Sequence, residues 1–278
     1  MGRTIVVFGG GGMKGLAHVG AWRALRDAGE EVDEIVGTSI GGLIGACLAG
    51  GLGWSELAPR ALALRKSEIA AINRWALLVN GIRQSSVLRG DRFRAFVEEL
   101  LPAERFDDLD RPLAVNAVDL ETGRTCWFGA GGRGDVAVAE AVYASCALPV
   151  FYPPAEIGGR YYVDGGVVDA LAVGRAAERG ADRIVAVDVG AGEVKDPRDT
   201  VAKGMVALHH RVFDIMASRR RRAALEAWEG PPELVYVRPA LDGYSTFDFA
   251  NVKTFLEEGY RATRAALAGR RRGLAEAS

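Results

Sequence analysis

Four consecutive glycines at positions 9–12 separate a short apolar run from a segment with helical spacing. The apolar run at 4–8 reads TIVVF, which is typical of a buried strand, and the helical segment follows at 16–28. Glycine is costly to order, so such a run indicates a tight turn or a close approach of the backbone to another group. The chain is therefore predicted to begin with a strand, a glycine loop and a helix.

Short apolar runs alternate with helical patterns along most of the chain. Further strands are predicted at 33–37, 113–118, 124–128, 161–163 and 183–189, and further helices at 41–49 and 201–228. Apolar strands separated by helices are typical of a mostly parallel sheet covered by helices on both faces. We predict a three-layer α/β fold in a single domain over 1–278. Within it, 58–89 is predicted to be a helical cap or insertion, and 201–278 a C-terminal helical extension.

The composition excludes several classes of protein. The 35 basic and 36 acidic residues nearly cancel, which argues against a protein held on nucleic acid by phosphate contacts. A hydrophobic fraction of 49% supplies a buried core and excludes a disordered chain. The three cysteines do not suggest a disulfide framework, and no segment has the length of a signal peptide's apolar region or a membrane-spanning helix. We expect a cytoplasmic protein whose contact with membranes is at most peripheral.

The glycine loop predicts an anion-binding site, because unpaired N–H groups and the helix dipole favour negative charge at a helix N-terminus. Gly10, Gly12 and Gly15 match the dinucleotide pattern G-x-G-x-x-G. That site also needs an acidic residue closing the second strand, whereas Asp33 and Glu34 open it. The second alternative is a phosphate-binding P-loop, but its motif G-K-[ST] does not occur at this loop. The third alternative is the oxyanion of an acyl-transfer intermediate, which backbone N–H groups stabilise.

Ser39 is the predicted nucleophile. Residues 37–41 read G-T-S-I-G, a G-x-S-x-G motif between a strand and a helix, where the glycines permit the sharp turn that exposes the serine hydroxyl. In a parallel sheet this turn and the glycine loop lie at the same edge. The alternative interpretation is a serine that only caps the helix.

Asp164 is the predicted base. It follows a short strand and precedes two glycines that leave room to aim its carboxylate, and burial would raise its pKa towards the working range. The histidines lie in helical segments without the loop setting of a catalytic histidine; they are His18, His209 and His210. The rival carboxylates, which are more simply cap or turn residues, are Asp119, Asp169 and Asp188.

Together these motifs resemble those of the patatin-like phospholipase family. The blocks are GGGMKG at 10–15, GTSIG at 37–41 and DGG at 164–166, in the family's order, and ASCALP at 144–149 resembles the segment ahead of the aspartate. The resemblance covers about residues 4–190. It implies a patatin fold and a serine hydrolase that cleaves acyl esters of lipids, of phospholipase A or lysophospholipase type.

The resemblance also implies site residues. Ser39 and Asp164 would form a catalytic dyad, with Lys14 as a nearby cation. The implied oxyanion hole consists of Gly10, Gly11 and Gly12. The family usually has arginine in place of Lys14, and often Asn and Pro in place of Ala170 and Ala172. No cofactor or metal is expected.

Two other functions stay open: a nucleotide-binding enzyme of Rossmann type, and a non-catalytic protein with the patatin fold. The expected partner is a lipid or acyl-ester substrate. The apolar stretch at 71–79 and the arginine runs at 219–222 and 270–272 indicate contact with an anionic lipid surface, with solvated helix ends as the alternative. The oligomeric state is not predicted.

Overall fold

The computed structural model describes residues 2–72, 83–192 and 196–276. Its strands are β1 (Thr4–Phe8), β2 (Glu34–Thr38), β3 (Leu113–Asp119), β4 (Thr125–Gly129), β5 (Ala155–Ile157), β6 (Arg160–Asp164), β7 (Arg183–Val187) and β8 (Glu233–Val237). Its α-helices are α1 (Ala17–Asp27), α2 (Ile40–Ala49), α3 (Trp54–Ala63), α4 (Lys66–Ile69), α6 (Gly90–Leu100), α7 (Val138–Cys146), α8 (Val173–Glu178), α9 (Pro197–Ala202), α10 (Met205–Glu226) and α11 (Val252–Glu276). Short 3₁₀ turns are η1 (Gly12–Leu16), η3 (Phe106–Asp108) and η4 (Gly165–Val167).

The strands form one mixed sheet in the order β5-β6-β3-β2-β1-β7-β8, with β4 paired to β3 outside this order. The strands β1, β2, β3, β7 and β8 pair in parallel, whereas β4, β5 and β6 pair antiparallel to their neighbours. β4 takes one edge of β3 over 114–118, so β2 and β6 share the other edge, at 113–116 and 117–119. The carboxyl ends of β2 and β6 therefore meet head to head beside β3.

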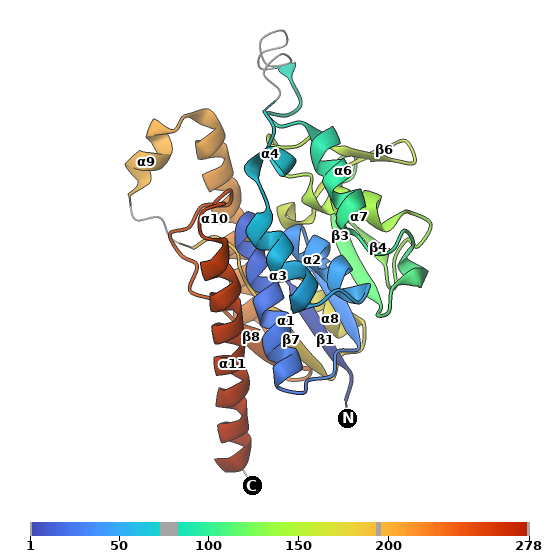
Figure 1. Cartoon of the computed structure of the whole chain (residues 1–278), viewed down its shortest axis with the longest axis vertical. Coiled ribbons are helices and arrows are strands. Elements are labelled where there is room, and N and C mark those ends of the chain that lie inside the picture. The colour runs from blue at the N-terminus through green and yellow to red at the C-terminus, as the bar shows by residue number, and fades with distance from the viewer. Residues whose placement is uncertain (1, 73–82, 193–195, 277–278) are drawn as a thin grey trace.

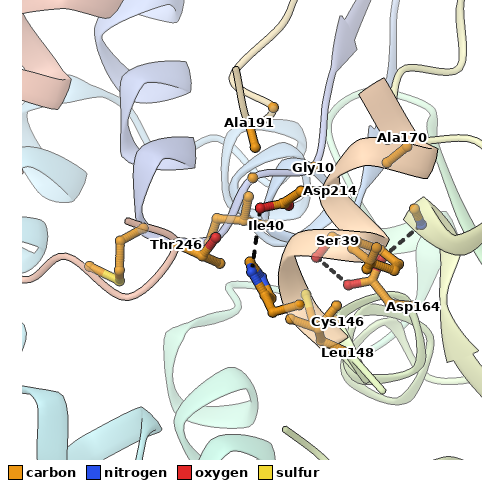
Figure 2. A pocket seen from close by; sticks show the side chains of 18 of the residues that line it. Gly10, Ser39, Ile40, Cys146, Leu148, Asp164, Ala170, Ala191, Asp214 and Thr246 are labelled. Carbon is orange, nitrogen blue, oxygen red and sulfur yellow. Dashed lines mark hydrogen bonds and ion pairs between the residues drawn. The ribbon is translucent and has the colours of Figure 1, made fainter. Parts of the chain in front are cut away.

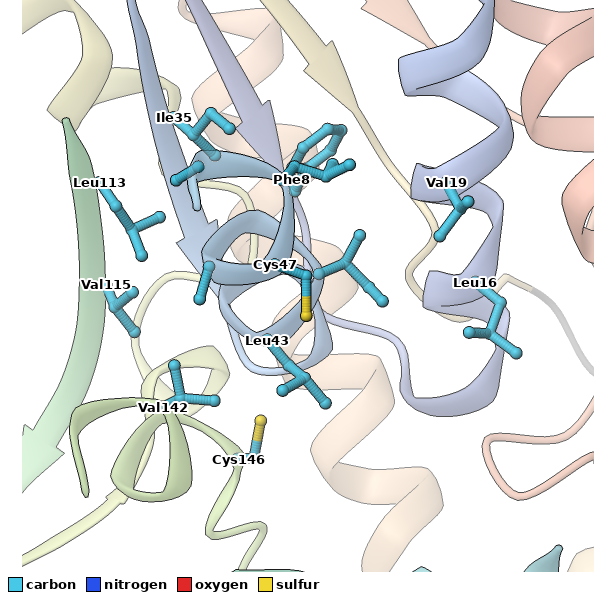
Figure 3. Close-up of a cluster of buried hydrophobic side chains, with 14 of the residues drawn as sticks. Phe8, Leu16, Val19, Ile35, Leu43, Cys47, Leu113, Val115, Val142 and Cys146 are labelled. Atoms are coloured by element: carbon cyan, nitrogen blue, oxygen red, sulfur yellow. The ribbon is translucent and has the colours of Figure 1, made fainter. Parts of the chain in front are cut away.

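Helices cover both faces of the sheet, which gives the three layers of an α/β fold (Figure 1). The side chains of β1 alternate between the two faces, as a strand requires. Val6 and Phe8 belong to the larger cluster with α1, α2 and α11, whereas Ile5 and Val7 belong to a second cluster with α8. In the larger cluster, Phe8 lies close to α2, as Figure 3 shows. The predicted fold class is confirmed.

The C-terminal third differs from the sequence pattern in two ways. One helix is predicted over 201–228, but α9 ends at Ala202 and α10 begins at Met205, separated by Gly204 with a φ of 85°. That left-handed conformation breaks a helix and suits glycine. The pattern over 201–278 also predicts only helices, yet this segment supplies β8, which pairs with β7. Its apolar run of four residues, Leu234 to Val237, is too short to identify a strand beside long helical patterns.

The segment at 58–89 is helical at its start, where α3 continues into it and α4 adds one turn. Residues 73–82 of this segment lie outside the described residues, so its role as a cap stays a prediction. Beyond them, Ser86 forms an isolated bridge with Val150. Of the helices in the described ranges, none combines the length and the apolar character needed to cross a membrane.

Candidate active site

Ser39 lies on the turn between β2 and α2, with β2 ending one residue before it and α2 beginning one residue after it. Its backbone takes a φ of 55° and a ψ of −127°, an unfavourable conformation for a residue with a side chain. Its N–H donates to the hydroxyl of Ser145 in α7 at 2.8 Å, which helps to hold this conformation. Gly41 permits the turn, because a Cβ there would lie 2.1 Å from the Phe8 carbonyl oxygen.

The register of β3 brings Asp164 to the serine. Thr38, the last residue of β2, lies opposite Asn116, and Asp164, the last residue of β6, lies opposite Ala117. These two residues of β3 are consecutive, and β2 and β6 occupy the same edge of that strand. Ser39 follows Thr38 directly, so the two strand ends place the hydroxyl and the carboxylate side by side.

The Ser39 hydroxyl donates to Asp164 Oδ2 at 2.6 Å, and the N–H of Gly166 donates to Oδ1 at 2.7 Å (Figure 2). Burial raises the pKa of the Asp164 carboxyl to about 6, although both hydrogen bonds favour the charged form and oppose the rise. A carboxylate with this pKa is mostly ionised at neutral pH and is a stronger base than an ordinary aspartate. The predicted nucleophile and the predicted base thus lie in hydrogen-bonding contact.

The glycine loop offers two unused donors to this site. The N–H of Gly9 donates to Val187 and that of Gly10 to Ala170 O (2.9 Å), so the Gly10 N–H is already engaged. Within the described ranges, the N–H groups of Gly11 and Gly12 have no acceptor. Of the three glycines predicted to form the oxyanion hole, these two have N–H groups free for a ligand.

His18 contacts the first residue of this loop. Its side chain is fully buried, and Nε2 lies 2.8 Å from the Gly9 carbonyl oxygen. A carbonyl oxygen only accepts, so Nε2 carries the proton in this contact. Burial lowers the pKa of the ring to about 4, so His18 is neutral at physiological pH. His209, by contrast, is exposed on α10.

The dyad lies in a cavity of about 100 Å³ that the glycine loop also lines. Figure 2 shows Ser39 and Asp164 on one side of this catalytic cavity, with apolar residues such as Ile40 and Leu148 around them. Cys146 also lines the cavity, but burial raises the pKa of its thiol well above the usual range. A thiol held neutral in this way is a poor nucleophile, so Ser39 remains the candidate.

A polar wall closes another side of the cavity. His210 Nδ1 of α10 lies 3.4 Å from Asp214 Oδ2, and both residues line the catalytic cavity and a neighbouring polar cavity of about 480 Å³. Lys14 lies in the wall of this polar cavity, and its side chain is buried. Burial lowers the pKa of the Lys14 ammonium, and the nearby Asp214 carboxylate opposes that effect.

The rival carboxylates have other partners. Asp119 pairs with Arg160 at 2.8 Å and accepts two backbone N–H groups in a turn. Asp188 pairs with Arg221 at 2.8 Å, and Asp169 accepts a backbone N–H two residues further on. These contacts are typical of cap, turn and ion-pair residues. The sequence indicates caps and turns for these carboxylates, but not the ion pairs with arginine.

Glu34, one of the two acidic residues that open the second strand in the sequence, is fully buried at the start of β2. Its carboxylate accepts two hydrogen bonds from Arg179, at 2.8 and 3.0 Å, and also pairs with Arg3. It lies at the strand end opposite to the glycine loop. The geometry therefore does not support a dinucleotide site.

Two residues that hold the backbone around the dyad were not predicted from the sequence. Ser145 fixes the Ser39 amide, and Asn116 donates to the Asp169 carbonyl oxygen at 3.0 Å, an acceptor that Thr38 Oγ1 shares at 3.2 Å. These bonds tie β2 and β3 to the segment that follows the base. One signal was present: Asn116 is the only polar residue inside the apolar run LAVNAV.

Comparisons with known proteins show which family this chain is similar to. The sequence model described as patatin-like phospholipase matches residues 6–177. Lysophospholipase NTE1 of Coccidioides immitis is 30% identical over 276 residues, covering 92% of this chain and 17% of that protein. An uncharacterized NTE family protein of Mycobacterium tuberculosis is 30% identical over 224 residues, covering 78% of this chain and 59% of that protein. This chain therefore spans less than two thirds of either relative.

Among solved structures, VipD from Legionella pneumophila is similar, with a TM-score of 0.61 and 16% identity. The match covers 96% of this chain and 67% of that one. At this identity the likeness supports the fold alone.

Proposed function

Because the chain belongs to the patatin-like phospholipase family, we propose that it is a serine hydrolase of lipid acyl esters, of phospholipase A or lysophospholipase type. The observation that carries this proposal is the 2.6 Å hydrogen bond from the Ser39 hydroxyl to the buried Asp164 carboxylate. The free N–H groups of Gly11 and Gly12 in the same cavity support it. A nucleophile, a base and oxyanion donors are the groups that acyl transfer requires.

In the first half of the reaction, Ser39 Oγ attacks the acyl carbonyl carbon while Asp164 Oδ2 takes the hydroxyl proton. The carbonyl oxygen becomes an oxyanion that accepts hydrogen bonds from Gly11 and Gly12. Each such donor contributes about 3 kcal/mol to transition-state stabilisation in comparable sites. When the intermediate collapses, the ester bond breaks, and the leaving alcohol takes the proton from Asp164.

In the second half, water attacks the acyl group on Ser39 and gives a proton to Asp164. The same N–H groups stabilise the second oxyanion. Collapse breaks the bond to Oγ, which regains the proton from the carboxyl, and the fatty acid leaves. Asp164 serves in turn as base and acid, a cycle that a pKa near 6 suits at neutral pH.

A fluorophosphonate probe tests the nucleophile. We expect the wild-type protein to be labelled and the Ser39→Ala variant to be inert, while Ser55→Ala, an exposed serine of α3, is labelled like the wild type. Equal labelling of Ser39→Ala and wild type would remove Ser39 from the mechanism. Unlabelled wild-type protein would favour the non-catalytic alternative, and a rise in melting temperature with NAD or ATP would favour the nucleotide-binding one.

Asp164→Asn tests the base. This variant keeps the size of the side chain but cannot accept the serine proton, so we expect turnover of a short-chain ester to fall by about three orders of magnitude, within the range for loss of a general base. Circular dichroism should match the wild type. Near-wild-type turnover would identify another base.

We further propose that α10 contacts the lipid surface. Five of its apolar side chains are 43–74% exposed and lie on one side of the helix; they are Met205, Leu208, Val212, Ile215 and the adjacent Met216. We call these residues the α10 apolar stripe. Its neighbours on the other side of the helix, such as His210 and Phe213, line the catalytic cavity. An apolar stripe beside the cavity suits a protein that takes its substrate from a membrane.

The basic residues contribute less than the sequence suggests. Within 219–222, Arg221 is buried against Asp188, whereas the side chain of Arg222 is 81% exposed at the C-terminal end of α10. An exposed basic residue near an anionic surface contributes about 1 kcal/mol. The apolar stretch at 71–79 falls mostly outside the described residues, as do the side chains at 270–272.

Co-sedimentation with phosphatidylcholine vesicles containing phosphatidylserine tests the membrane contact. We expect the wild-type protein to pellet and a Leu208→Ser/Ile215→Ser variant to stay in the supernatant. Leu120→Ser, an equally exposed leucine outside α10, is the control and should pellet like the wild type. Unchanged pelleting of the double variant would contradict the role of the α10 apolar stripe.

A further inference from the structure

A second cavity, of about 380 Å³, adjoins the catalytic cavity on its apolar side. We call it the side pocket. Four residues line both cavities: Met13, Ile40, Ile69 and Phe93. One of these shared residues, Ile40, directly follows the nucleophile, which itself lines only the catalytic cavity. Its volume lies within the usual range of ligand-binding pockets.

The inner wall of the side pocket is apolar. It is formed by Leu16 at the end of η1, Val19 of α1, Leu43 of α2, and Leu57 and Ala61 of α3, all of which are at most 6% exposed. Figure 3 shows Val19 on α1, Leu16 just before this helix, and Leu43 on the neighbouring α2. A wall of this kind offers no hydrogen-bonding partner to a polar ligand, which would lose its hydration on entering.

Charged side chains occur only at the outer end of the side pocket among the described lining residues. Arg60, Glu68 and Glu99 are exposed there, where α3, α4 and α6 approach one another. Two carboxylates at this opening would repel a phosphate group. The polar cavity on the other side of the dyad is different, because basic side chains balance the carboxylates in its lining. Its basic residues are Lys14, Lys203 and Arg211, and its acidic residues are Asp196, Asp199 and Asp214.

We propose that the side pocket holds the acyl chain of the substrate, with its carbonyl carbon at Ser39 and its polar leaving group towards the polar cavity. This inference rests on the proposed function and adds the orientation of the substrate and the residues that set chain-length preference. Ala61 is the smallest side chain among the buried α3 residues that line the side pocket. A larger side chain there would shorten the space available to the acyl chain.

Chain-length profiles test the assignment. Each methylene that enters an apolar pocket favours binding by about fourfold. We expect kcat/KM of the wild type to rise from butyrate to longer p-nitrophenyl esters, and Ala61→Phe to lose about fiftyfold on the laurate ester, as about three excluded methylenes imply. Butyrate hydrolysis should change less than twofold. Leu62→Phe is the matched control, because Leu62 is 57% exposed on the same helix.

Leu57→Ala gives an independent test by enlarging the side pocket. It should move the preferred ester to a longer chain, so that the ratio of kcat/KM for long esters to kcat/KM for butyrate rises. Unchanged profiles in both Ala61→Phe and Leu57→Ala would overturn the assignment, as would an equal loss of butyrate and laurate hydrolysis in folded Ala61→Phe protein.

A binding experiment separates this proposal from the proposed function. Titration calorimetry with palmitate on the Ser39→Ala protein needs no catalysis. We expect palmitate to bind, and Ala61→Phe in the Ser39→Ala background to weaken binding by about tenfold or more. If wild-type protein hydrolyses no ester while palmitate binding still depends on Ala61, the proposed function fails and the side pocket stands. If esters are hydrolysed but palmitate binding is unchanged by Ala61→Phe, only the side-pocket assignment fails.

Discussion

Lowering the pH should reduce the activity of this protein about tenfold between pH 7 and pH 5. The base must be ionised to accept the serine proton, and burial raises the pKa of Asp164 to about 6. The ionised fraction then falls from about 90% at pH 7 to about 10% at pH 5. An aspartate with an ordinary pKa would stay more than about 90% ionised at pH 5 and would leave the rate almost unchanged.

The same group changes stability in the opposite direction. Its pKa in the folded protein lies above the unfolded value of 3.8, so its contribution to stability is present below about pH 4 and is lost as the pH rises through about 6. A rise of about two pKa units corresponds to about 3 kcal/mol. Relative to Asp164→Asn, which does not titrate, the wild type should therefore gain about 2.4 kcal/mol in free energy of unfolding from pH 7 to pH 4, because the unfolded carboxyl is still partly ionised at pH 4.

The assay is kcat/KM for a soluble short-chain ester between pH 4.5 and 8.5, with a thermal melt at each pH to verify that the protein is folded. Urea unfolding of wild type and Asp164→Asn at pH 4 and pH 7 gives the stability difference. A rate that stays flat down to pH 5 in folded protein would refute the assignment of Asp164 as a desolvated base. A pH-independent stability difference would refute the role of burial in raising its pKa.

Two substitutions test the structure around the site. Gly41→Ala places a Cβ 2.1 Å from the Phe8 carbonyl oxygen, so it should lower the free energy of unfolding by about 3 kcal/mol in urea titration; a loss below about 0.5 kcal/mol would show that the turn can relax. Arg221→Ala removes a buried partner of Asp188 and should cost about 2 kcal/mol by the same measurement. Arg222→Ala, an exposed pair on the same helix, should cost less than about 0.5 kcal/mol, and equal costs would contradict the burial argument.

Much of the first half of the fold follows from local pattern. β1 is predicted at its observed bounds, and β2 within one residue, because short apolar runs bounded by glycines are local signals. The common edge of the glycine loop and the serine turn follows from parallel pairing of β1 with β2. These are the elements that position Ser39.

Features of the site that depend on contacts between distant segments could not be predicted from the sequence. The Gly10 N–H is engaged by Ala170 O, a partner 160 positions away, so the choice of free amides needs the tertiary structure. Lys14 lies two residues after Gly12 of the glycine loop, but in the folded protein it lines the polar cavity and not the catalytic cavity.

Because β2 and β6 meet beside β3, catalytic turnover depends on the alignment of β6 with β3. A slip of β6 by one position along β3 would move the carboxylate about 3.4 Å and turn it to the other face of the sheet. Such a molecule could retain nearly all its helices and most of its buried surface, yet its serine would have no proton acceptor. Recovered turnover after refolding would therefore count correctly aligned molecules, which spectroscopic helix content does not distinguish.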